Sequence, residues 1–575
     1  MLLRKPLSID LTKNLDDNSD FKEQLKVICS DSFQEFSELI NNISKKNKDN
    51  IDWWVSSPAN RNTLTSNLYL KFCIIKLIYD IENKDLINKI IVDSKNFKKV
   101  LSQIIIKKKI IVKNYDNSFL QILKLLKFTF MQFTRRILQL LACRLSSKKT
   151  KTFKNELTLI DTYVLPGFYS KDRYYNGLWD NLKNEDKKDL FFIPSIAYTK
   201  IRKGYNIIGN IYEVYRELRI SKRPFLIKED FINLFDIIYS VFFTFRVFFL
   251  NLQTIQYKNV DISPLFIEDS RDLKNFTLAI EGILNYRFIK NLNKNSLKIN
   301  FFIDWWENQP VDKGYHFAIS KYYPRVNSVG YLGYVPRNYE LQLMTTKYEK
   351  KYGVIPDRIA VIGKSVGKFV KKLNFDQKIT NAPAFRYSYL WSPKIVEKNI
   401  NFFNILIALP INYSDSEIIL KKILEIDYLK NNDLKLLLKP HPTMNYLVIE
   451  KFINKYSQNN IIITNENAEN ILKKSDLVIS SMSIISLEAI SMGIPTILID
   501  RDTIIDYSPI PQDLDKNLWN RCKTSDEIIK SIKFYKNKNI VNNNKFSKIA
   551  LEIKKNYFNK INDENINNLI HDKYA

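Results

Sequence analysis

Two polar turns in the last third of the chain hold the residues best suited to bind a phosphorylated ligand. The first follows the apolar run 434–438 and reads Lys439-Pro440-His441-Pro442. The second, at residues 480–483 (Ser-Ser-Met-Ser), lies about one βα unit later. Ammonium and imidazole groups bind phosphate, and so do hydroxyls and backbone N–H groups at the start of a helix. A carboxylate one to two helical turns further on, at Glu488, is placed to accept hydrogen bonds from a ribose, so the pattern predicts a sugar-nucleotide site.

Each turn also has an ordinary structural explanation. Ser is a favoured helix N-cap, and a His flanked by Pro often only shapes a turn. The order of the two turns at strand ends favours binding, because ligands of a doubly wound sheet bind beyond the carboxyl ends of its strands. The ligand-contacting residues that we predict here are Lys439, His441, Ser480, Ser481, Ser483, Ser486 and Glu488, and His441 is also a predicted catalytic residue that contacts the leaving-group oxygen.

A second group of candidate residues follows the strand-like run 301–303. It reads Asp304-Trp305-Trp306-Glu307 and continues to Lys313. A carboxylate at a strand end can act as a general base toward an acceptor hydroxyl, and we predict Glu307 in this role, with Asp304 as the second choice. The structural alternative is a buried Trp pair with Glu307 and Lys313 forming a solvated salt bridge.

Two further segments resemble phosphate-binding and metal-binding motifs. The segment 358–365 resembles a strand followed by a phosphate loop, but it lacks the first glycine of that motif at the required offset, which excludes a P-loop. Its residues Gly363, Lys364 and Ser365 are still predicted to line the ligand cleft. The D-x-D sequence at 500–502 is interpreted as loop polarity, and no metal site is predicted.

Alternating strand and helix patterns must position these residues. In the C-terminal third, apolar runs alternate with helical patterns; the runs lie at 404–409, 434–438, 460–464, 476–480 and 495–499. This alternation predicts a parallel sheet with helices on both faces. The N-terminal part has less regular strand candidates at 89–94, 156–163, 190–194, 298–303 and 358–362, and helical patterns near 207–219, 231–253 and 272–291. We predict an α/β fold with two Rossmann-type domains facing a cleft, and helical insertions in the N-terminal half.

The overall composition limits the partners. The formal net charge is +28, but the basic residues are mostly Lys, scattered among Ile and Asn, and no recognition motif accompanies them. We therefore predict no nucleic-acid partner and a weak attraction to anionic lipid or substrate. Four dispersed cysteines without a C-x-x-C pair and three histidines make a disulfide framework or a zinc site improbable.

The two most apolar stretches, 119–142 and 233–253, are both interrupted by basic residues. Neither offers the roughly 20 clean residues that a membrane span needs. Both are interpreted as buried or interfacial helices, and the basic segment 119–149 is a candidate for contact with an anionic membrane surface. An ordinary core helix with snorkelling Lys and Arg is the alternative. The N-terminus has no apolar signal region, so we expect a cytoplasmic protein, with peripheral attachment at the inner face of the membrane left open.

The region from about 400 to 505 resembles the donor domain of GT-B glycosyltransferases. More narrowly, it is similar to the bacterial capsule and surface-polysaccharide group that includes polysialyltransferases and capsular Kdo transferases. His441-Pro442 and Ser480-Ser481 match their His-Pro and Ser-Ser motifs, and Glu488-Ala489 with Gly493 and Pro495 resembles an E-A-x-x-x-G-x-P stretch. The segments 52–66 and 304–314 look like those of surface-carbohydrate biosynthesis proteins.

This resemblance implies a function and a domain plan. It implies a glycosyltransferase that moves a sugar from a nucleotide-sugar, with CMP-activated donors favoured, to a surface glycan or lipid-linked saccharide, without a cofactor. CDP-glycerol polyol-phosphate transferases carry similar motifs, and a nucleotide-sugar epimerase or an inactive scaffold or export component also stays open. The expected parts are an N-terminal extension, an acceptor-side domain, a donor domain and a helical tail, at 1–50, 51–395, 396–522 and 523–575.

Overall fold

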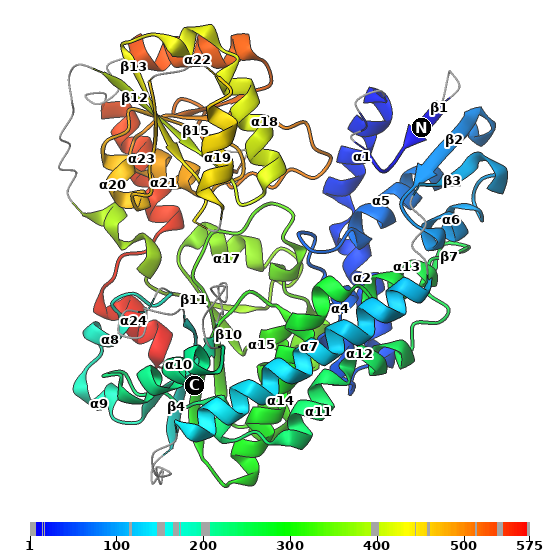
Figure 1. Cartoon of the computed structure of the whole chain (residues 1–575), viewed down its shortest axis with the longest axis vertical. Coiled ribbons are helices and arrows are strands. Elements are labelled where there is room, and N and C mark those ends of the chain that lie inside the picture. Colours follow the sequence, from blue (N-terminus) through cyan, green and yellow to red (C-terminus); the bar gives the residue numbers. More distant parts are fainter. Residues whose placement is uncertain are drawn as a thin grey trace.

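The computed structural model describes most of the chain between residues 7 and 571 (Figure 1). The ranges it describes are 7–13, 15, 18–113, 118–146, 156–164, 172, 174–196, 207–392, 402–442, 444–456, 460–511, 514–537 and 544–571. Three parallel sheets organise these residues, together with one short hairpin formed by β6 (Gln256–Tyr257) and β7 (Val260–Asp261).

The first sheet is small and has the strand order β1-β2-β3, all parallel. Its strands are β1 (Leu7–Asp10), β2 (Ile87–Val92) and β3 (Ile110–Val112). Strand β1 pairs with β2, and buried residues between Ile9 and Ile43 contribute to the core of the N-terminal part. The helices of this part are α1 (Ser19–Asp31), α2 (Phe33–Lys46), α3 (Ile51–Trp54), α4 (Ser57–Asn60), α5 (Leu68–Tyr79) and α6 (Lys95–Leu101).

The second sheet has six parallel strands in the order β11-β10-β9-β8-β4-β5. They are β4 (Leu157–Val164), β5 (Leu190–Ile196), β8 (Ile299–Trp305), β9 (Asn327–Leu332), β10 (Arg358–Val361) and β11 (Lys378–Asn381). The longer helices around it are α7 (Ser118–Leu145), α10 (Ile207–Ile220), α11 (Leu234–Val241), α13 (Ser263–Ser270), α14 (Phe276–Lys294) and α15 (Pro310–Tyr322). The shorter ones are α8 (Leu178–Asn181), α9 (Asn184–Lys187), α12 (Phe243–Arg246), α16 (Lys347–Lys351) and α17 (Lys364–Val370).

The third sheet also has six parallel strands, in the order β14-β13-β12-β15-β16-β17. They are β12 (Phe403–Ala408), β13 (Leu434–Lys439), β14 (Ile461–Ile463), β15 (Leu477–Ser480), β16 (Thr496–Ile499) and β17 (Trp519–Cys522). Numbered along the chain, this order is the doubly wound one of dinucleotide-binding domains, with its switch point between β12 and β15. Its helices are α18 (Tyr413–Leu424), α19 (Tyr446–Ile453), α20 (Ala468–Lys473), α21 (Ile485–Ser491) and α22 (Ser525–Asn537).

The two large sheets confirm the predicted α/β class with two Rossmann-type domains. Every predicted strand of both sheets is present. The prediction of one long helix near 231–253 was wrong. The segment instead forms two shorter helices, α11 and α12, followed by a 3₁₀ turn at Val247–Phe249. Bulky Phe residues line this segment, and Phe243 is fully buried, so tertiary packing divides the helix.

The tail after residue 522 returns from the third sheet to the second. Helix α22 packs on β17, α23 (Asn544–Tyr557) packs on α21 and α17, and α24 (Asp563–Ile570) packs beside β11. Figure 1 shows α24 beside the lower domain, far from the sheet that precedes it in sequence. The last helices therefore tie the two Rossmann-type domains together.

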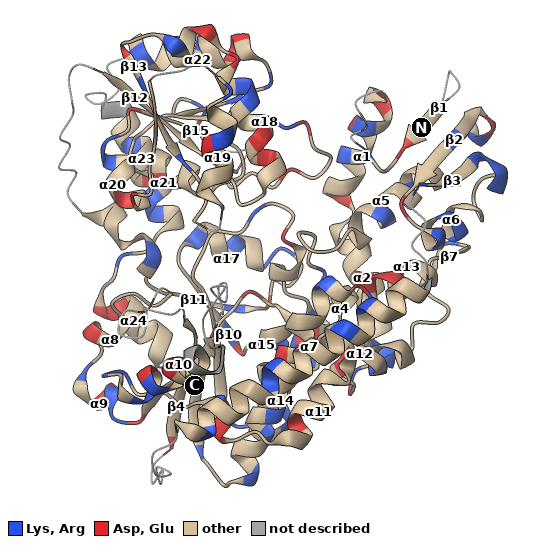
Figure 2. Ribbon diagram, viewed as in Figure 1, with Lys and Arg blue, Asp and Glu red and all other residues tan. Residues whose placement is uncertain are grey.

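Lys and Arg residues occur on all parts of the molecule (Figure 2). None of the helices that the structure describes is long and apolar enough to cross a membrane.

Candidate functional site

The turn after β15 lies at the switch point of the third sheet, as the sequence predicted for a ligand site. Ser480 is fully buried, and its hydroxyl donates to the carbonyl of Ala408 at the end of β12, 3.1 Å away. This bond joins the two strands on either side of the switch point. The hydroxyls of Ser481 and Ser486 are buried too, and within the described chain they have no hydrogen-bond partner. They are polar atoms whose burial without a partner is costly, and a ligand oxygen would satisfy them.

Glu488 lies on α21, buried beside this turn. Tyr389 donates its hydroxyl to the Glu488 carboxylate, and burial raises the pKa of that carboxyl. Lys439, at the end of β13, interacts electrostatically with Glu488, and burial lowers the pKa of its ammonium group. Its Nζ donates to the carbonyl of Glu466. The predicted residues Lys439, Ser480, Ser481, Ser486 and Glu488 thus lie at or shortly after the carboxyl ends of β13 and β15.

His441 and Ser483 lie in the same two turns, and both are partly exposed. The backbone carbonyl of His441 accepts from the N–H of Met444 at 2.8 Å, which closes the turn after β13. The carbonyl of Ser483 accepts from the N–H of Ser486 at 3.1 Å in the turn that begins α21. Both side chains remain predicted ligand contacts.

Glu307 follows β8 in the second sheet and is the predicted base. The indole Nε1 of Trp305 donates to its carboxylate at 2.8 Å. Burial raises the pKa of Glu307, while the Trp305 bond and the charges of Arg386 and Arg337 act in the opposite direction. The predicted alternative, a salt bridge between Glu307 and Lys313, is absent from these described residues, because Lys313 pairs with Glu349 at 2.8 Å instead.

Arg386 lies between the two predicted parts of the site, the group around Glu307 in the second sheet and the group around Glu488 in the third. It lies in the 3₁₀ segment Phe385–Trp391 between the two large sheets. Its guanidinium is 5.8 Å from the ring centres of both Tyr174 and Trp305. The charge of Arg386 acts on Glu307 in one domain and on Glu488 in the other. Arg386 is therefore within electrostatic range of both predicted carboxylates, one in each domain.

Sequence reasoning did not single out Arg386 or Tyr389. Both lie in the stretch 380–402, which the broken periodicity marked only as a domain join. The available signal was an arginine and a tyrosine within an apolar, aromatic linker. Residues of a linker between two domains face both domains, so polar side chains there are candidates for a site at the junction.

Asp304 lies deeper than Glu307, in the core of the second sheet. Its side chain is fully buried and is 3.1 Å from Nε2 of His316. Asp161 lies on the neighbouring strand β4, and its carboxylate accepts from Ser195 and Tyr315. Burial and the charge of Asp304 raise the pKa of Asp161 to about 7, and burial also raises the pKa of Asp304. This position favours Glu307 over Asp304 as the group that meets a substrate.

Gly363 packs closely against the backbone at the end of α23 and does not lie in an open loop. A Cβ atom there would lie 2.5 Å from the carbonyl oxygen of Asn556, so the end of α23 requires a glycine at this point. Lys364 is exposed and Ser365 partly exposed at the start of α17. Gly363, Lys364 and Ser365 therefore lie where the C-terminal tail returns from the third sheet to the second.

The D-x-D residues are engaged in ion pairs. Asp502 pairs with Lys22 and Lys26 of α1 at 2.6 and 2.8 Å, which lowers its pKa to about 2. Arg501 pairs with Asp415, and Asp500 lies 4.0 Å from Arg521. Within the ranges that the structure describes, no three His, Cys, Asp or Glu side chains group in a way that would hold a metal ion.

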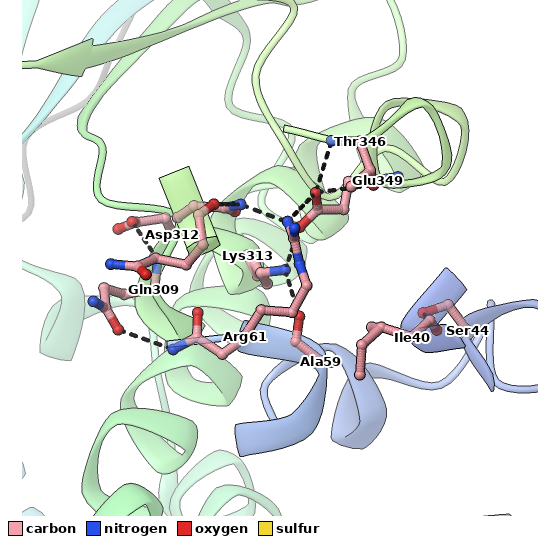
Figure 3. Close-up of polar contacts among 12 residues, drawn as sticks. Ile40, Ser44, Ala59, Arg61, Gln309, Asp312, Lys313, Thr346 and Glu349 are labelled. Atoms are coloured by element: carbon pink, nitrogen blue, oxygen red, sulfur yellow. Dashed lines mark hydrogen bonds and ion pairs between the residues drawn. The ribbon is translucent and has the colours of Figure 1, made fainter. Parts of the chain in front are cut away.

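The two segments that resemble surface-carbohydrate biosynthesis proteins meet in the core (Figure 3). Arg61 and Lys313 both pair with Glu349, each at 2.8 Å, and all three are buried. Burial opposes ionisation of Glu349, but the charges of Arg61 and Lys313 lower its pKa to about 2. Gln309 accepts from Asn60 at 3.1 Å. This network holds α4 and α15 together behind Glu307, and it gives these motifs a structural role.

Comparison with known proteins adds similarity of fold only. No family model and no curated protein matches the chain. The S. aureus MnaA–UDP co-structure is 12% identical, covers 71% of this chain and 94% of its own, and has a TM-score of 0.39. The lipopolysaccharide outer core galactosyltransferase WaaB is 10% identical, with coverage of 72% and 97% and a TM-score of 0.37. The glycosyltransferase SnogD from Streptomyces nogalater is also 10% identical, covers 70% and 95%, and has a TM-score of 0.37. At these values the likeness supports no conclusion about activity.

Proposed function

We propose that the protein is a glycosyltransferase that uses a nucleotide-activated sugar, with a CMP-linked donor favoured. The observation that carries this proposal is the 3₁₀ segment Phe385–Trp391, in which Arg386 lies 5.8 Å from the ring centre of Trp305 and Tyr389 donates its hydroxyl to Glu488. A donor bound at the third sheet and an acceptor bound at the second would therefore meet at this junction. The acceptor would be a surface polysaccharide or a lipid-linked glycan, and the reaction would take place at the cytoplasmic face of the membrane.

The donor half of the proposed site is the edge of the third sheet. Lys439, His441 and Arg386 would neutralise the phosphate, and the buried hydroxyls of Ser481 and Ser486 would donate to its oxygens. Glu488 would accept from the ribose. These roles use groups that the fold already holds in place, so little ordering would be needed on binding.

The chemical step would use Glu307 as the base. The acceptor oxygen forms a bond to the anomeric carbon, the bond from that carbon to the phosphate oxygen breaks, and the acceptor proton moves to Glu307. The nucleotide leaves with both electrons of the broken bond, and Arg386 and Lys439 stabilise its charge. Because burial raises the pKa of Glu307, its carboxylate is a stronger base than a solvated one.

We propose that no resident metal takes part. The carboxylates of Asp500 and Asp502 face Arg521, Lys22 and Lys26, which would compete with a cation. Turnover that survives dialysis against a chelator is the expected result.

The test begins with thermal-shift measurements of the full chain with CMP, CDP, UDP and GDP. We expect selective stabilisation by CMP. Stabilisation by CDP would favour the polyol-phosphate transferase, and stabilisation by UDP or GDP alone would contradict a CMP-linked donor.

Glu307→Gln tests the base. We expect transfer to slow by roughly 10²–10⁴-fold, because the proton acceptor is removed. The nucleotide-induced thermal shift should stay as in the wild type, since Glu307 lies outside the donor half. Asp376→Asn, at a side chain that is 76% exposed, serves as the control. Wild-type turnover in Glu307→Gln would remove Glu307 from the mechanism.

A further inference from the structure

Helix α7 is apolar on the face that points away from the protein. Its inner face packs on the core through Leu125, Phe128 and Leu140. Four large apolar side chains on the outer face are 45–71% exposed: Phe119, Leu123, Leu126 and Phe130. Their spacing of four, three and four residues places them in one stripe along the helix. A helix on the surface of a soluble domain normally carries polar residues on this face.

Basic residues accompany the stripe and acidic residues are absent from α7. Lys124 and Lys127 are exposed on the same half of the helix, and the sequence of α7 contains neither Asp nor Glu. Figure 2 shows Lys and Arg along α7. Arg136 is engaged elsewhere, because it pairs with Glu281 at 2.6 Å on the inner face. On the first half of α7, which carries the stripe, the exposed basic residues are Lys124 and Lys127; Arg144 is exposed in the last turn.

The segment next to α7 also exposes aromatic side chains. Helix α11 packs on α7, and the Thr129 hydroxyl donates to Thr244 of α12 at 3.1 Å. In this segment Phe235 is 77% exposed and Phe249 is 85% exposed. Exposed aromatic and aliphatic side chains mixed with Lys are typical of helices that lie in the interface of a bilayer.

We propose that the outer face of α7 binds an anionic membrane surface. The stripe would enter the headgroup region, and Lys124 and Lys127 would contact anionic lipid headgroups. Charge complementarity favours a membrane over a second copy of this chain. Two copies of α7 face to face would bring like charges together with no acidic residue of α7 to compensate them, in a protein of net charge +28.

The test is flotation of the full chain with phosphatidylcholine vesicles, with and without added phosphatidylglycerol. We expect binding that needs phosphatidylglycerol and weakens at high salt. A double variant, Leu123→Glu with Phe130→Glu, should bind at least about tenfold more weakly, because apolar side chains no longer enter the interface. Replacing Lys124 and Lys127 by Gln should weaken binding by about fivefold for each lysine.

Phe375→Glu is the matched control, because Phe375 is 76% exposed and lies outside α7, in the connection between α17 and β11. It should float like the wild type, and circular dichroism should show that all variants are folded. Three outcomes would overturn the proposal: no binding of the wild type to anionic vesicles, equal loss in the Phe375 control, or a wild-type dimer in size-exclusion chromatography that the stripe variant abolishes.

Discussion

Single residues at the junction of the two large sheets give the site its electrostatic character. Arg386 lies between aromatic rings, and its charge opposes the effect of burial on the carboxyls of Glu307 and Glu488. Without a cation, burial would favour the neutral acids. Arg386 therefore helps to keep both carboxyls ionised, which a base and a ribose acceptor require.

Asp161 is a second single residue with a measurable effect: it makes the free energy of unfolding depend on pH. Burial and the charge of Asp304 raise its pKa to about 7 in the folded protein, from an ordinary value of 3.8. A raised pKa means that its contribution to stability is present below about pH 4 and is lost as the pH rises to about 7. Asp161→Asn keeps an acceptor for Ser195 and Tyr315 but does not titrate. We expect the wild type to lose up to about 4 kcal/mol more than the variant between pH 4 and pH 8.

Urea unfolding at several pH values measures this difference. Glu340, whose pKa burial raises to about 7, acts in the same direction in both proteins, so its contribution cancels from the comparison, which reports on Asp161 together with its coupling to Asp304. Parallel stability curves for the two proteins would show that Asp161 has no raised pKa.

At the scale of elements, five strands of the third sheet were predicted from the sequence, whereas β17 (Trp519–Cys522) was not, and the site was predicted only in part. Apolar runs such as 434–438 alternate with helical periods, and this pattern depends on neighbours in sequence. The predicted edge with Lys439, Ser480 and Glu488 followed from the rule for strand ends. Arg386 did not, because its role depends on two carboxyls about 80 and 100 residues away, in separate domains. The division of 231–253 also depends on packing that the local pattern does not contain.

Helices α14 and α15 approach each other through two glycines, and this contact supports the segment that holds Glu307. A Cβ atom at Gly314 would lie 1.9 Å from the backbone oxygen of Gly282. Backbone cannot move aside as a side chain does, so Gly314→Ala should separate the helices. We expect a loss of about 1–3 kcal/mol in the free energy of unfolding, measured with urea.

Gly367→Ala is the control for this substitution. Its Cβ would be 3.0 Å from a methyl group of Ile379, a flexible neighbour, and Ala favours the helix by about 1 kcal/mol. The control should stay within about 1 kcal/mol of the wild type. Equal free energies of unfolding for Gly314→Ala and the wild type would show that α14 and α15 can move apart without loss of stability.

At the scale of the whole molecule, two sets of contacts link the third sheet to the rest of the chain. Asp502 reaches Lys22 and Lys26 on α1, and Tyr507 donates to the carbonyl of Thr63 at 2.8 Å. On the other side, Asn559 bonds to the backbone of Val361 and Ala382. The junction that holds Arg386 is thus held from both sides, which limits how far the two half-sites can separate.

Arg358 tests the second of these links. Its buried guanidinium donates to the carbonyl of His571 at 2.9 Å and also to those of Asn568 and Leu569 at the end of α24. Lys and Arg side chains stabilise helix C-termini in this way. Arg358→Gln leaves carbonyls without their donor, so we expect a loss of about 2–4 kcal/mol and release of α24.

Limited proteolysis followed by mass spectrometry detects that release as faster cleavage after residue 557 than in the wild type. Arg216→Gln, at an exposed pair with Glu213, should be cleaved like the wild type. If α24 holds the two domains together, Arg358→Gln should also weaken the nucleotide-induced thermal shift, although residue 358 lies far from the donor edge. A variant with loosened α24 and an unchanged thermal shift would show that the tail stabilises the second sheet without holding the site together.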